Sequence, residues 1–154
     1  MLLDQLQSDL AAAQKARDEA KVSTLRFLLG AVFNLQIEKG NDYVLTDADV
    51  LSVIVMQGKT HNESIEMFGK GGRSDLVEKE KAELLILQSY LPAQLSETEI
   101  RELITKIKTA NSGADFGTIM KLCMTELRGK ADGTVVSQIL REYVWYSNQF
   151  RIPV

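Results

Sequence analysis

The chain has 154 residues, of which 45% are hydrophobic and 25% charged, and its formal net charge is −3. This composition is that of an ordinary globular protein, and the length suffices for one domain or for two small helical halves. A single cysteine excludes an intrachain disulfide, the N-terminus lacks the pattern of a signal peptide, and no apolar run approaches the roughly 20 residues of a membrane span. We therefore expect a soluble, cytoplasmic protein that does not enter a membrane.

The N-terminal half shows helical periodicity in four stretches. Apolar residues recur three or four positions apart over residues 3–17, 22–36, 46–68 and 74–91. Gly40-Asn41 predicts the end of the second helix, and the segment from Thr46 to Asp49 predicts a capping box for the third. Ser74-Asp75 is expected to cap the fourth. The run from Leu84 to Leu87 is apolar on several faces, which predicts that this helix contacts more than one neighbour.

Pro92 interrupts this pattern, and three shorter helices are expected after it. A capping box at 96–99 opens the first of them, Asp115 opens the second, and Asp132-Gly133 begins the third. No stretch alternates apolar and polar residues over a length that would predict a β-strand. The sequence therefore predicts an all-α fold with an N-terminal four-helix subdomain (residues 1–91), a linker (92–96) and a three-helix C-terminal subdomain with a tail (97–154).

From the sequence we expect no catalytic residues, no metal site and no cofactor. His61 is the only histidine and Cys123 the only cysteine, so a zinc site with the usual soft ligands is not expected. We interpret Cys123 as a core residue, His61 as a border or surface residue, and Glu78, Glu80 and Glu83 as a solvated helix face. A deep pocket lined by Arg73, Glu80 and Glu83 would reopen the question of enzymatic activity.

Two groups of cations are candidates for binding an anion. The glycine-rich turn at 69–74 contains Lys70 and Arg73, and amides at a helix start beside two cations can hold a phosphate, although a flexible turn explains the same residues. Lys121 and Arg128 are seven positions apart and fall on one helix face, and Lys130 follows in the next turn. These three cations are candidates for contact with a nucleic-acid backbone, or they form an ordinary solvated face.

Several short strings of the sequence occur together in a specific order over about residues 1–144. They are 15–18, 23–26, 45–47, 63–68, 72–76, 80–84, 90–96, 116–120 and 129–133. The most specific are the Tyr-Leu-Pro segment within 90–96 and the Gly-Lys-Ala-Asp-Gly segment at 129–133. In these strings and their order the chain resembles the YqeY-like family, which is related to the C-terminal tail domain of the GatB subunit of the aspartyl/glutamyl-tRNA amidotransferase.

The resemblance implies two helical subdomains and a role in docking on tRNA or another structured RNA, or on an amidotransferase or synthetase partner protein. A label of carbon–nitrogen ligase with glutamine as amide donor would come to this chain from its family. It would not describe an activity of this chain, because the domains and the subunit that perform amide transfer in the amidotransferase are missing here. Lys59 aligns with a family lysine and joins the candidate cations. The alternative is a protein-protein interaction module without RNA affinity, which the acidic N-terminal half favours: residues 1–92 carry 10 Lys and Arg against 14 Asp and Glu.

The sequence departs from the family at two places. Family members often have two consecutive basic residues where this chain has His61 and Asn62. The loss of positive charge weakens the case for RNA contact on that face, because phosphate contacts supply much of the affinity. The tail from Trp145 to Val154 extends past the usual family end. Three alternatives are left for this segment: it packs on the body of the protein, it is disordered, or it contacts a partner.

Overall fold

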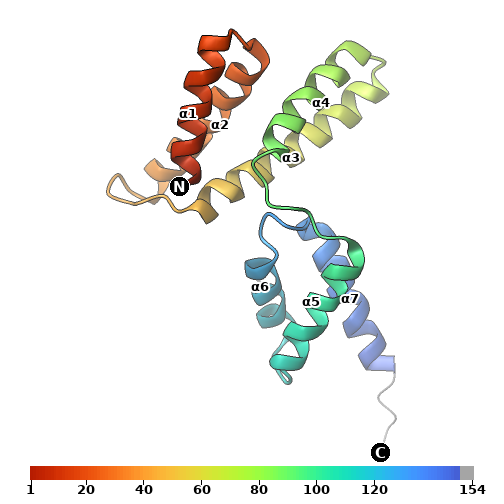
Figure 1. Cartoon of the computed structure of the whole chain (residues 1–154). Helices are drawn as coiled ribbons and strands as arrows, with labels where there is room; N and C mark the ends of the chain where they lie inside the picture. Colours follow the sequence, from red (N-terminus) through yellow and green to blue (C-terminus); the bar gives the residue numbers. More distant parts are fainter. Residues whose placement is uncertain (150–154) are drawn as a thin grey trace, which may run out of the picture. The chain divides into compact units, whose positions relative to one another are not determined.

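The computed structural model of the chain is all-α, as the sequence predicts (Figure 1). It describes the backbone of residues 1–149 and the side chains of residues 1–143, so the aromatic tail after Tyr143 lies outside the described side chains. Seven helices and no strands occur in this part of the chain. They are α1 (Leu2–Ala16), α2 (Glu19–Lys39), α3 (Asp47–Lys70), α4 (Ser74–Gln88), α5 (Glu97–Ala110), α6 (Phe116–Glu126) and α7 (Gly133–Gln149).

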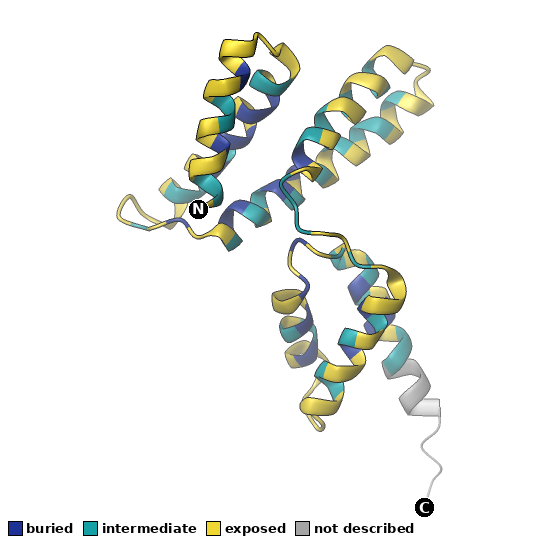
Figure 2. Ribbon diagram, viewed as in Figure 1, coloured by how far each residue is buried: buried dark blue, intermediate teal, exposed yellow. Residues whose placement is uncertain are grey.

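The helices are divided between two units, Met1–Leu91 and Pro92–Val154. The N-terminal unit contains α1 to α4 and the C-terminal unit contains α5 to α7. In each unit the buried residues follow the helix faces that meet one another, and the outer faces are exposed (Figure 2). None of the helices between residues 1 and 149 combines the length and the apolarity that crossing a bilayer requires.

The N-terminal unit consists of two antiparallel helix pairs, α1 with α2 and α3 with α4 (Figure 1). Helix α4 contacts α2 as well as α3, which confirms the prediction of more than one neighbour. Its apolar run is not covered on all sides, since Leu87 is buried whereas Leu85 is 67% exposed. The core of the unit is made of Leu6, Leu25, Leu28, Leu29, Val32, Leu45, Val50, Ile54 and Leu87.

Helix starts in the N-terminal unit follow the sequence signals with one exception. Thr46 and Asp49 form the predicted capping box of α3, in which each side chain accepts from the other residue's backbone N–H. The predicted Ser74-Asp75 cap of α4 is wrong. The capping position is held by Arg73, whose carbonyl accepts the first helical hydrogen bonds, and no side chain caps the helix there.

The C-terminal unit packs α5, α6 and α7 around a small apolar core. Ser96 and Glu99 form the predicted capping box of α5, and Asp115 caps α6. Cys123 is buried in this core, as predicted, and burial raises the pKa of its thiol. The core residues are Ile100, Ile104, Ile119, Cys123, Leu127, Val136, Ile139 and Leu140.

Candidate functional site

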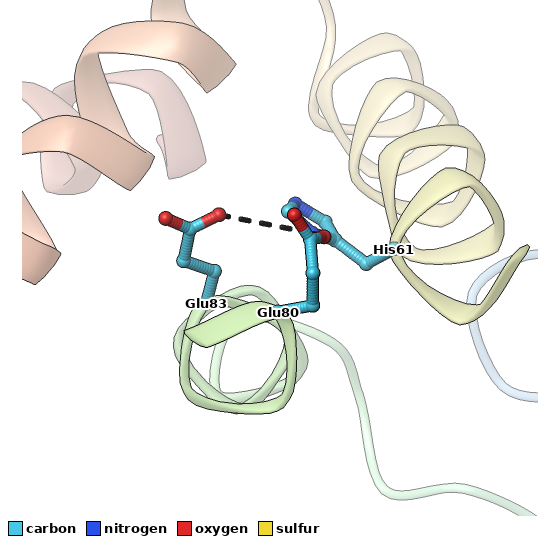
Figure 3. Close-up of side chains that lie close together, drawn as sticks. All are labelled: His61, Glu80 and Glu83. Carbon is cyan, nitrogen blue, oxygen red and sulfur yellow. Dashed lines mark hydrogen bonds and ion pairs between the residues drawn. The ribbon is translucent and has the colours of Figure 1, made fainter. Parts of the chain in front are cut away.

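The first candidate site joins α3 to α4 in the N-terminal unit. His61 lies on α3, and Glu80 and Glu83, one turn apart, lie on the same face of α4. The glycine turn between the two helices, where Gly72 has φ 70°, reverses the chain and brings these faces together. The three side chains converge in the space between the helices (Figure 3).

The imidazole of His61 lies between the two carboxylates. Its Nδ1 is 2.5 Å from Glu80 Oε2 and 3.8 Å from Glu83 Oε2. The side chains of His61, Glu80 and Glu83 are only 13%, 19% and 15% exposed. The interpretation of Glu80 and Glu83 as a solvated face is therefore wrong, because packing of α3 against α4 covers them, whereas Glu78 on the same helix is 74% exposed.

A cavity of about 520 Å³ adjoins this cluster. Gln57, one helical turn before His61, lines it and is 8% exposed. Its Nε2 donates to the carbonyl of Phe27 at 3.5 Å, and its Oε1 has no hydrogen-bond partner among the described residues. A buried amide oxygen without a donor is costly, so this atom is poised to accept a hydrogen bond or to bind a cation.

The cavity matches the sequence-based expectation only in part. It is lined by Glu80 and Glu83 but not by Arg73. Its lining includes two exposed apolar side chains, Phe27 (70% exposed) and Met56 (71% exposed). The lining residues come from α2, α3 and α4 and are Ser23, Thr24, Phe27, Met56, Gln57, Thr60, His61, Ser64, Lys79, Glu80 and Glu83.

The second candidate site is the turn between α6 and α7 in the C-terminal unit. Lys121 on α6 and Arg128 and Lys130 in the turn are all exposed. The prediction that Lys121 and Arg128 share a helix face is wrong, because α6 ends at Glu126 and Arg128 lies beyond it. None of the three forms an ion pair with any carboxylate in the described part of the chain, although the exposed Glu126 and Asp132 are near them in sequence.

This turn is held by hydrogen bonds to the segment that precedes α5. Gln94 Nε2 donates to the Gly129 carbonyl at 2.7 Å, and Leu95 N donates to the Lys130 carbonyl at 2.8 Å. Gly129 has φ 73°, a conformation that favours glycine. The two most specific family-like strings in the sequence are therefore bonded to each other, and the backbone that carries Arg128 and Lys130 is fixed.

The candidate cations of the N-terminal unit differ in whether they form ion pairs within the described part of the chain. Lys70 pairs with Glu66 at 2.7 Å and Arg73 pairs with Asp75 at 3.1 Å. Lys59 is exposed and has no ion pair among the residues that the structure describes. In the glycine-rich turn, the amides of residues 71–73 donate to carbonyls at the end of α3, so these amides are already occupied.

Comparison with known proteins finds a family and several relatives. The model of the YqeY-like protein family matches residues 3–144. The protein named "Altered inheritance of mitochondria protein 41, mitochondrial" of Pyrenophora tritici-repentis is 33% identical over 94% of this chain and 81% of its own length. The protein of the same name from Lachancea thermotolerans is 38% identical over 69% of this chain, which spans only 59% of that relative. "Uncharacterized protein C22F3.15" of Schizosaccharomyces pombe is 33% identical over 59% of this chain and 72% of its own length.

The names of these relatives correct the prediction of where the protein is located. The sequence predicted a cytoplasmic protein from its single cysteine and from the lack of a signal-peptide pattern and of a membrane-spanning apolar run. Relatives from Pyrenophora, Lachancea and Eremothecium are named as mitochondrial proteins, and this finding overturns the cytoplasmic assignment.

Proposed function

Because the chain belongs to the YqeY-like protein family, we propose that it is an accessory module that docks on tRNA or on an amidotransferase-type partner that handles tRNA. The observation that carries the proposal is that Lys121 on α6 and Arg128 and Lys130 in the α6–α7 turn are exposed and form no ion pair with a described carboxylate. The partner class comes from the family's relation to the tail domain of the tRNA-dependent amidotransferase. In this proposal the chain performs no amide transfer itself, and the label of carbon–nitrogen ligase describes its amidotransferase relatives.

Two features of the α6–α7 turn and of the helix before it support phosphate contact. Lys121, Arg128 and Lys130 are exposed and form no ion pair with a described carboxylate, so binding a phosphate would not first require breaking one. The hydrogen bonds from Gln94 and Leu95 fix the backbone of the turn, so less conformational entropy is lost on binding. The cations would position an RNA backbone without reading its sequence.

Filter binding with bulk tRNA at two salt concentrations tests the proposal. We expect the double variant Arg128→Gln, Lys130→Gln to bind more weakly, and the slope of log K against log salt to fall by about 1 for each phosphate that the variant no longer neutralises. The matched control is Lys106→Gln, Arg141→Gln, which removes two cations elsewhere in the same unit. Binding that is absent in the wild-type chain, or equal in the two double variants, would refute the proposal.

The second candidate function is a protein-protein interaction module without RNA affinity. It is favoured by the exposed apolar side chains of Phe27 and Met56, which line the N-terminal cavity, and by the acidic balance of that unit. We expect a partner to be retained from nuclease-treated extract and to be absent with Phe27→Ser. Val44→Ser is the control, because Val44 is 76% exposed in the same unit and does not line the cavity. Equal retention by both variants would speak against this surface.

A further inference from the structure

We propose that His61, Glu80 and Glu83 bind a divalent transition-metal ion of the Zn²⁺ class, with the amide oxygen of Gln57 available as an additional oxygen donor. The site lies in the N-terminal unit and is independent of the RNA contacts proposed for the C-terminal unit. The proposal depends on four observations: the donor set, the spacing of the donor atoms, the charge balance and the unpartnered amide oxygen of Gln57.

The donor set suits a metal of this class. One imidazole nitrogen and two carboxylate oxygens are ligands that Zn²⁺ accepts, and the remaining positions can be filled by water or by a carbonyl oxygen. The nitrogen favours a transition metal over Mg²⁺, which prefers an all-oxygen environment.

The spacing fits a single ion after small side-chain movements. One donor atom from each residue lies within 4.8 Å of the others. Bond lengths of about 2.0–2.2 Å to Zn²⁺ place neighbouring ligand atoms about 3.3 Å apart in a tetrahedral site. Glu80, whose oxygen is 2.5 Å from Nδ1, would move outward, and Glu83, at 3.8 Å, would move inward.

The charge balance also points to a cation. One imidazole faces two carboxylates that are covered by the packing of α3 against α4, and covered carboxylates are favourable only when they are paired. Lys79 lines the cavity but forms no ion pair with Glu80 or Glu83 in the described part of the chain. A divalent ion would compensate both carboxylates at once.

Gln57 supplies an observation in favour of a ligand here that is independent of the His61–Glu80–Glu83 cluster. It is more than nine-tenths buried, it lines the cavity beside His61, and its Oε1 has no partner among the described residues. Gln57 and His61 are four residues apart on α3 and therefore share a face. This oxygen can bind the metal or accept a hydrogen bond from a water that the metal holds.

Calorimetric titration of the untagged, metal-free chain with ZnCl₂ tests the site. We expect saturable one-to-one binding and a higher unfolding midpoint of the N-terminal unit with Zn²⁺ present. His61→Gln should lower the affinity by about 100-fold or more, and Glu80→Gln and Glu83→Gln by at least about tenfold each. Glu78→Gln should leave it unchanged, because this exposed carboxylate lies on the same helix outside the cluster.

A spectroscopic readout distinguishes this site from unspecific binding at surface carboxylates. Because His61 is the only histidine, its ¹⁵N imidazole resonances report the metal without ambiguity. We expect them to shift on Zn²⁺ addition in the wild-type chain and in Glu78→Gln. No binding by the wild-type chain, unshifted imidazole resonances, or equal affinity in His61→Gln would overturn the proposal and leave a plain histidine–carboxylate contact. Circular dichroism shows whether His61→Gln folds, and the Glu83→Gln variant tests the ligand set if it does not.

Discussion

Replacing Asp49 by asparagine removes a charge on which the start of α3 depends. One carboxylate oxygen accepts from Lys39 Nζ. The other accepts from the Tyr43 hydroxyl at 3.0 Å and from the backbone N–H and the hydroxyl of Thr46 at 2.9 and 2.7 Å. An asparagine of the same shape has only one oxygen, so its amide NH₂ would face one of these donors.

The expected loss can be estimated from these contacts. Hydrogen bonds to a charged group contribute about 1.5–3 kcal/mol, and loss of a capping side chain costs about 1 kcal/mol. The Lys39 side chain is 36% exposed, so solvent weakens its share of the interaction. We therefore expect Asp49→Asn to lower the free energy of unfolding of the N-terminal unit by about 2 kcal/mol at pH 7.

The same contacts predict how this difference changes with pH. The hydrogen bond from Lys39, followed by those from Thr46, holds the pKa of Asp49 well below its usual 3.8 in the folded chain. Stability from a lowered carboxyl pKa is present above the unfolded-state value and is lost as the pH falls toward the folded-state value. Since asparagine does not titrate, the difference between wild type and variant should shrink by about 1 kcal/mol between pH 7 and pH 3.

Urea unfolding followed through amide resonances of the N-terminal unit measures this difference without contribution from the C-terminal unit. The control is Asp42→Asn, because Asp42 is exposed in the loop before α3 and has no hydrogen bond or ion pair among the described residues. The reasoning is refuted if Asp49→Asn unfolds like the wild type at pH 7, or if the difference is as large at pH 3 as at pH 7.

Further predictions concern the C-terminal unit. Ser96→Ala should lower its free energy of unfolding by about 1 kcal/mol, because it removes one side of the capping box of α5, and should leave the N-terminal unit unchanged in the same NMR titration. Ile104→Ala, at a fully buried position, should cost about 2–5 kcal/mol in urea unfolding, and a smaller loss would contradict the described core. Cys123 should react with a thiol reagent at pH 8 only after denaturant is added, because burial both covers the thiol and raises its pKa; rapid labelling of the native chain would contradict this.

Local signals in the sequence predicted much of the fold. The capping boxes at Thr46 and Ser96 each involve residues three positions apart, so the pattern that forms them can be read directly from the chain. The start of α4 differs from its prediction, because a serine and an aspartate before an apolar run look the same whether they cap a helix or occupy its first turn. The RNA-contact residues stay a prediction, since exposure and the absence of a described ion partner are compatible with phosphate binding but also with a solvated surface.

The histidine–carboxylate cluster could not be predicted from spacing, since His61 and Glu80 are 19 residues apart and belong to different helices. On α4 alone, Glu80 and Glu83 alternate with lysines and look like a solvated face. Only the return of the chain through the Gly71-Gly72 turn places them against α3. The glycines of this turn are visible in the sequence, but the residues that the turn brings together are not, because the faces on which α3 and α4 meet depend on how the two helices pack.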